Sequence, residues 1–250
     1  MLIYFLVGAC AFGAAVLVWR HDMYDREPWW ALLAAALLGA LLMPVCGAAE
    51  DFVIYRGTAT PSSLWIAANA AFWEGMARMA VTAAAATLLP RIFNDPMDGV
   101  TYGSMAGLGM AVYESGLYLR AGAPGGGEFA RLYAHLVLGG IAGFPFGMLR
   151  MRMPGAGRSL LLCGIGAALL HWAIDAASLH AVARPEFLTG ATVVVCAAVL
   201  VATGVYGGLT AHAAEWSRAR FAPFSMKRLL GWPLNLIGKR GDDPPPGPVG

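Results

Sequence analysis

The run Leu64–Leu89, LWIAANAAFWEGMARMAVTAAAATLL, has the length of a membrane span, yet it carries a glutamate and an arginine. About 20 predominantly apolar residues cross the hydrocarbon core as a helix. Glu74 and Arg78 are the only charged residues of the run, and their spacing of four residues places them on one face of that helix. A carboxylate at such a depth needs a positive partner or a proton, so we expect Arg78 to pair with Glu74.

The rest of the chain has the same apolar character. Of its 250 residues, 58% are hydrophobic and 13% are charged, and the mean hydropathy is +0.62. Soluble domains average about a quarter charged residues. These values predict an all-α polytopic membrane bundle of about seven transmembrane helices. The predicted spans are 2–19, 29–48, 64–89, 97–120, 129–149, 159–182 and 188–211.

Outside the spans, the sequence predicts only short additions to a single transmembrane domain at 1–212. Residues 213–240 mix basic and apolar side chains, which is typical of an amphipathic segment at the membrane interface. Residues 241–250 are rich in proline and are predicted to be a disordered tail. The net charge of +2 is too small to indicate a nucleic-acid partner.

The basic residues predict the orientation, because cytoplasmic loops carry an excess of lysine and arginine. With seven spans, twelve basic residues fall on one side of the membrane. The other side has four, which are Arg56, Arg120, Arg131 and Arg184. The N-terminus is therefore predicted to be outside and the C-terminus cytoplasmic.

Four consecutive spans, from the third to the sixth, contain ionisable side chains. Each costs at least a few kcal/mol at bilayer depth, so a chain that carries several is expected to bring them together. Counted along the helices, the expected site lies roughly 9–16 Å below the outer surface, in the outer half of the membrane. The candidate site residues are Glu74, Arg78, Glu114, His135, His171 and Asp175.

The residue types of this site permit three chemistries. In the first, Glu74 activates water as a general base, a histidine assists it, and His171 stabilises the developing oxyanion. In the second, zinc is bound by His135, His171 and an acid, Glu114, while Glu74 polarises the metal-bound water. In the third, the acids and histidines form the proton relay of a transporter.

A glycine repeat marks the fourth predicted span. Gly99, Gly103 and Gly107 recur every four residues and form a bare stripe along one face of a helix. Small residues dominate helix interfaces in lipid because they let two backbones approach closely. The stripe therefore predicts close packing against another helix.

Five short segments, in order along about residues 20–180, carry a resemblance to a known family. They are Tyr24–Pro28, Trp73–Arg78, Asp98–Tyr118, Arg131–Gly147 and Leu170–Asp175. Trp73–Arg78 is similar to a Glu-Glu-x-x-Lys motif, and the last segment is similar to a His-x-x-x-Asn/Asp element. Together the segments resemble the PrsW family of intramembrane proteases, within the group that includes the CAAX prenyl endopeptidases and bacteriocin-processing proteins.

The resemblance implies a membrane-embedded peptidase of the bacterial cytoplasmic membrane, active in regulated intramembrane proteolysis. Its catalytic core would lie at about 64–182. Its substrate would be a single-span membrane protein, such as an anti-sigma factor, cut near the outer face. The carry-over makes Glu74 the catalytic base, with Glu114, His135 and His171 completing the site. Asp175 would orient His171, and Arg78 would replace the motif lysine.

One departure from the motif bears on activity. Gly75 stands where the motif has its second glutamate. The resemblance therefore also leaves open a catalytically impaired binding scaffold of the same fold. Family members are often labelled metalloproteases, whereas the CAAX relatives suggest a metal-free glutamate mechanism. Of the two, we favour metal-free, glutamate-activated water, with zinc as the alternative.

Overall fold

The computed structural model describes residues 2–21, 25–57, 61–122 and 127–230, and over these residues it is all-helical. Each of the seven predicted spans coincides with one helix, and the second and seventh helices continue well past their predicted ends. A 3-10 turn, η1 (Pro185–Phe187), precedes the last helix. The helices are α1 (Leu2–His21), α2 (Trp29–Gly57), α3 (Ser63–Leu88), α4 (Pro96–Arg120), α5 (Gly127–Arg150), α6 (Ala156–Ala183) and α7 (Leu188–Leu230).

Among the described residues, five segments are long and apolar enough to cross a membrane: α1, α2, α5, α6 and the segment that contains α7. The chain is therefore an integral membrane protein. The remaining two helices, α3 and α4, contain charged site residues, and α4 is buried almost continuously from Pro96 to Ala111. A helix enclosed by protein meets little lipid, so its own sequence need not be strongly apolar.

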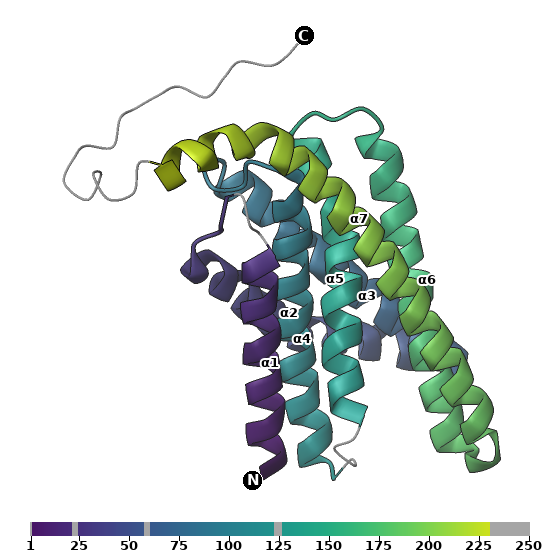
Figure 1. Ribbon diagram of the computed structural model, residues 1–250. Coiled ribbons are helices and arrows are strands. Elements are labelled where there is room, and N and C mark those ends of the chain that lie inside the picture. Colours follow the sequence, from purple (N-terminus) through teal and green to yellow (C-terminus); the bar gives the residue numbers. More distant parts are fainter. Residues whose placement is uncertain (1, 22–24, 58–60, 123–126, 231–250) are drawn as a thin grey trace.

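The central helix of the bundle is α4, which packs most extensively against α5 and then against α2. Figure 1 shows α1, α4 and α5 side by side, while α6 and α7 form a hairpin that diverges from them at its lower end. The long α7 runs unbroken to Leu230, through the first part of the predicted interfacial segment 213–240. The predicted tail 241–250 lies outside the described residues.

The glycine stripe of α4 faces a second glycine stripe on α5. A Cβ atom on Gly99 would lie 2.6 Å from the carbonyl oxygen of Gly143 and 2.8 Å from the amide nitrogen of Gly147. Gly103 and Gly107 are equally close to the α5 backbone, at Gly139 and His135. Neither helix has room for a methyl group at this interface, so the predicted close packing is confirmed and α5 is the partner.

The end of the bundle where α4 begins is held together by buried carboxyl groups. Asp95 caps α4 by accepting from the amide of Asp98 at 3.0 Å, and the hydroxyl of Ser217 on α7 donates to Asp95 at 2.8 Å. The hydroxyl of Tyr102 donates to Glu27, just before α2, at 2.5 Å. Burial raises the pKa of Glu27 to about 7, against the hydrogen bond from Tyr102. These contacts join the α1–α2 connection and α7 to the first turns of α4.

Candidate active site

The six ionisable residues predicted to meet do lie together, and we call them the ionisable cluster. Glu74 and Arg78 come from α3, Glu114 from α4, and His135 from α5, while α6 supplies the last two, His171 and Asp175. The four helices are brought into contact by the packing around α4 and by α6, which packs on both α3 and α5.

Arg78 lies at the centre of the ionisable cluster. Its Nη2 atom is 2.9 Å from Oε2 of Glu74, which confirms the predicted ion pair. The same atom is 3.2 Å from Nδ1 of His135 and 3.4 Å from Nδ1 of His171. Only 1% of the arginine side chain is exposed. One guanidinium therefore joins three helices, which the sequence did not reveal.

The contacts of Arg78 determine the tautomer of both histidines. Arginine can only donate hydrogen bonds, so each Nδ1 facing it must carry a lone pair. The protons are then on the Nε2 atoms, which lie 3.2 Å from Oε2 of Glu114 and 3.2 Å from Oδ2 of Asp175. The sequence predicted that Asp175 orients His171, and the geometry also pairs His135 with Glu114.

A second arginine completes the cluster on its more exposed side. Nε of Arg131 is 3.4 Å from Oε2 of Glu114, and the same guanidinium is hydrogen-bonded to Glu128 and lies 4.2 Å from the ring centroid of Tyr118. The side chains of Arg131 and Asp175 are 25% and 29% exposed, against 6% for Glu74. The cluster therefore opens past Arg131 and Asp175. Sequence reasoning used Arg131 as a marker of orientation and as the start of one resembling segment, and gave it no place in the site.

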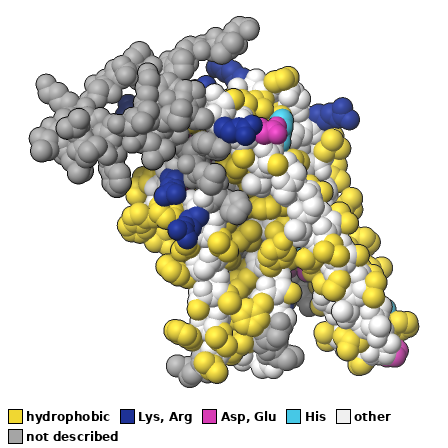
Figure 2. Space-filling view, in the orientation of Figure 1, with side chains coloured by type: hydrophobic (Ala, Val, Ile, Leu, Met, Phe, Trp, Pro, Cys, Tyr) yellow, Lys and Arg dark blue, Asp and Glu magenta, His cyan; other side chains and the backbone are white. Residues whose placement is uncertain are grey.

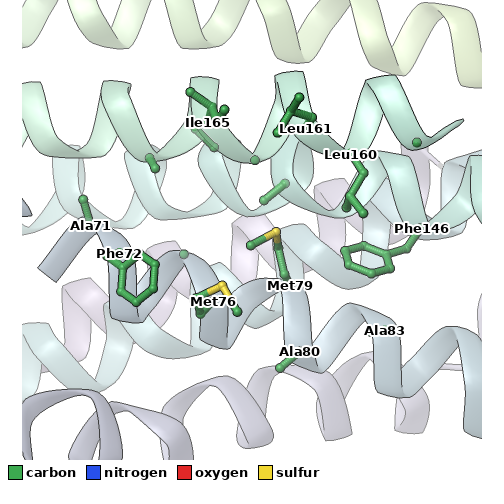
Figure 3. A pocket seen from close by; sticks show the side chains of 16 residues that line it. Ala71, Phe72, Met76, Met79, Ala80, Ala83, Phe146, Leu160, Leu161 and Ile165 are labelled. Atoms are coloured by element: carbon green, nitrogen blue, oxygen red, sulfur yellow. The ribbon is translucent and has the colours of Figure 1, made fainter. Parts of the chain in front are cut away.

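Gly75, the departure from the motif, lines a space that no residue of the cluster lines. It lines an apolar groove of about 720 Å³ between α3 and α6, with α5 at its base, and a Cβ on Gly75 would meet no atom within 4 Å. Figure 3 shows Phe72, Met76 and Met79 of α3 opposite Leu161 and Ile165 of α6 across this space. A glutamate at position 75 would enter the groove, so the glycine removes no carboxylate from the ionisable cluster. We call this space the α3–α6 groove.

The α3–α6 groove ends near the cluster. Beyond it, the indole Nε1 of Trp172 donates to the carbonyl oxygen of Leu64 at 3.1 Å and joins the start of α3 to the later part of α6. Trp172 is the next residue after His171. The seam between these two helices is therefore closed by a hydrogen bond at the level where His171 enters the cluster.

Comparison with known proteins bears on this arrangement. A family model described as PrsW family intramembrane metalloprotease matches residues 27–205, which include all six residues of the ionisable cluster. The chain belongs to the PrsW family. No curated protein and no solved structure gave a match.

The PrsW family is a family of intramembrane peptidases. The family description also implies a metal ion. Among the described residues, Glu74, His135 and His171 form a group whose possible ligand atoms lie within 4.8 Å of one another. This set differs from the zinc set predicted from the sequence, because Glu114 lies behind His135 and contacts its other ring nitrogen.

A carboxylate and two imidazoles are suitable ligands for a metal ion, but the guanidinium of Arg78 fills the space between them. Nη2 of Arg78 is within 3.4 Å of an atom of each of the three residues. Arginine stays protonated in proteins, and its charge repels a metal ion at this distance. The ionisable cluster with Arg78 in place therefore does not fit a metal ion.

Proposed function

We propose that this chain is an intramembrane endopeptidase in which Glu74 activates water to hydrolyse a peptide bond of a single-span membrane protein near the outer leaflet. The observation that supports this most is that Arg78 contacts Glu74, His135 and His171 at one buried position. A carboxylate with a fixed positive partner and two imidazoles is a set suited to general-base hydrolysis.

Each residue of the cluster has a part in this mechanism. Glu74 removes a proton from water as the water oxygen attacks the peptide carbonyl carbon. The same proton then passes to the leaving amine as the C–N bond breaks. Nε of Arg78 has no hydrogen-bond partner among the described residues, so it is available to donate to the developing oxyanion. Glu114 and Asp175 hold the two imidazoles in place.

We favour hydrolysis without a metal ion, and cleavage in proteoliposomes tests both parts of the proposal. Purified protein would be mixed with a panel of single-span substrates, with and without a chelator. Cleavage that is insensitive to the chelator is the expected result. Cleavage that the chelator blocks would assign the reaction to zinc, and folded protein without cleavage of any substrate would favour the binding scaffold.

We also propose a topology, with the N-terminus outside and the C-terminus cytoplasmic, in the bacterial cytoplasmic membrane. On the face shown in Figure 2, arginine side chains lie mostly toward the end of the molecule where α7 ends, and hydrophobic side chains dominate elsewhere. Basic residues favour the cytoplasmic side. This orientation places the site in the outer half of the membrane.

The topology can be checked with a peptide tag fused after Gly250. In sealed vesicles of known orientation, the tag is expected to be cleaved by an added protease in inverted vesicles and to be protected in right-side-out vesicles. A tag on the N-terminus serves as the control and should show the reverse pattern. A C-terminal tag cleaved in right-side-out vesicles would contradict the assignment of the site to the outer half.

The α3–α6 groove supports a membrane-spanning substrate, and the resemblance favours one like an anti-sigma factor. We propose that the groove holds the apolar helix of this substrate. Its lining is almost wholly apolar and includes small residues on both helices, such as Gly75, Gly164 and Ala168. Small residues allow another helix to approach closely in lipid. The two helices that form the groove also carry four of the six cluster residues.

Filling the groove should selectively reduce the cleavage of a single-span substrate. Gly164→Phe places a large side chain where a Cβ would be 3.5 Å from the Met79 sulfur, at the centre of the groove. We expect kcat/KM for a single-span substrate to fall on the order of tenfold, and cleavage of a short soluble peptide with the same scissile sequence to stay unchanged. Gly166→Phe, on the same helix but outside the groove, is the control. Equal losses with both substrates would indicate a general defect, and no loss would fit a lipid chain in the groove.

A further inference from the structure

We propose that the guanidinium of Arg78 occupies the position of a metal ion, and that shortening this side chain converts the cluster into a transition-metal site. The proposal concerns metal binding alone, so it stands or falls independently of peptidase activity. It follows from the disagreement between the family description and the contacts of Arg78.

The atoms around Arg78 have the character of a metal site. Its Nη2 contacts one carboxylate oxygen and two imidazole nitrogens, at 2.9, 3.2 and 3.4 Å. Two histidines and a glutamate are a familiar zinc-binding set. Nδ1 of His135 and Oε2 of Glu74 are 3.8 Å apart, close to the roughly 3.3 Å that separates two ligands of tetrahedral zinc at normal bond lengths.

The surroundings of the two histidines also match those of metal ligands. Ligating imidazoles usually donate their other N–H to a carboxylate, which fixes the tautomer and the ring orientation. Glu114 and Asp175 lie 3.2 Å from the Nε2 atoms of His135 and His171. The two Nδ1 atoms lie 3.2 and 3.4 Å from Nη2 of Arg78, so this one guanidinium nitrogen fills the space between both imidazoles.

The charge of Arg78 explains why a metal ion and this side chain exclude one another. Guanidinium does not lose its proton at accessible pH. A divalent ion among the same three ligands would lie within about 3–4 Å of that charge, in a buried setting where water screens their repulsion little. Arg78 is 1% exposed and bound through both terminal nitrogens, so it has no open path away from the ligands.

Cobalt titration of the full-length protein in detergent, after removal of metals with a chelator, tests the proposal. The wild type is expected to bind no stoichiometric Co²⁺. Arg78→Ala is expected to bind one Co²⁺ per chain, with the intense visible absorption of a tetrahedral site. The double variant Arg78→Ala/His171→Ala should lose this absorption, and Arg78→Lys, which keeps the positive charge, should remain metal-free.

Folding provides a second measurement, because Arg78→Ala leaves Glu74 buried without its positive partner. We expect Zn²⁺ to raise the melting temperature of Arg78→Ala and to leave that of the double variant unchanged. Stoichiometric binding by the wild type would overturn the proposal. So would an Arg78→Ala protein that folds but stays empty, or one that fails to fold even with Zn²⁺, since the ion should replace the missing charge.

Discussion

Replacing Glu74 with glutamine will reduce cleavage of a single-span substrate by at least about 100-fold, the lower end of the range for general acid–base groups. The amide keeps the size of the side chain but cannot accept a proton from water. Oε2 of Glu74 is also the acceptor for Arg78 at 2.9 Å, so the amide leaves the arginine without its anionic partner. Initial rates in proteoliposomes, at matched protein content, measure the effect.

The control for this change is Glu186→Gln, which alters an exposed glutamate in η1. It should cleave at the wild-type rate. If Glu74→Gln kept a rate within a few-fold of the wild type, Glu74 would not be the base. If the wild type itself cleaved no substrate while binding single-span proteins equally well with and without Glu74, the scaffold would be the better description.

Gly107→Ala should destabilise the protein by about 3 kcal/mol, at the upper end of the cost of overpacking. The added methyl group would overlap the carbonyl oxygen of His135, a backbone atom that cannot move without shifting α5. The displacement acts at the residue that carries one imidazole of the cluster, so cleavage should fall together with stability. Thermal unfolding of the purified protein in detergent is the measurement.

Gly116→Ala is the matched control, since it makes the same substitution on the same helix. Its Cβ would have as its nearest neighbour only the Arg120 guanidinium, at 4.0 Å. Alanine is favoured over glycine inside a helix by about 1 kcal/mol, so this variant should be as stable as the wild type or slightly more stable. Equal melting temperatures for Gly107→Ala and Gly116→Ala would contradict the close approach of α4 and α5.

The sequence predicted the helices and the meeting of the six residues because both depend on local or additive properties. Span length and apolar content determine where a helix can cross, and the cost of burying Glu74, Glu114 or Asp175 alone demands partners. The stripe of Gly99, Gly103 and Gly107 likewise predicted a close contact from local sequence alone. These arguments require no knowledge of how the helices are rotated.

The features that the sequence did not reveal all depend on such rotations. Glu114 was placed among the zinc ligands, but the turn of α4 directs it to the far ring nitrogen of His135. Arg78 was expected to pair only with Glu74, and a long side chain can reach three helices in ways that spacing does not encode. The position of Gly75 in the α3–α6 groove follows from the rotation of α3 against α6. A motif comparison alone counted that glycine as a missing carboxylate.

The position of Arg78 has a consequence for the order of events during turnover. Glu114 and His135 belong to α4 and α5, which interlock through glycines and have no room to slide, whereas α3 and α6 are separated by the groove and joined at Trp172. If α3 and α6 part to admit a chain from the lipid, we expect Arg78 to move away from His171 and the His135–Glu114 contact to stay intact. If the proposed function holds, we expect admission and chemistry to be separate in time, with no cleavage while the two helices are apart.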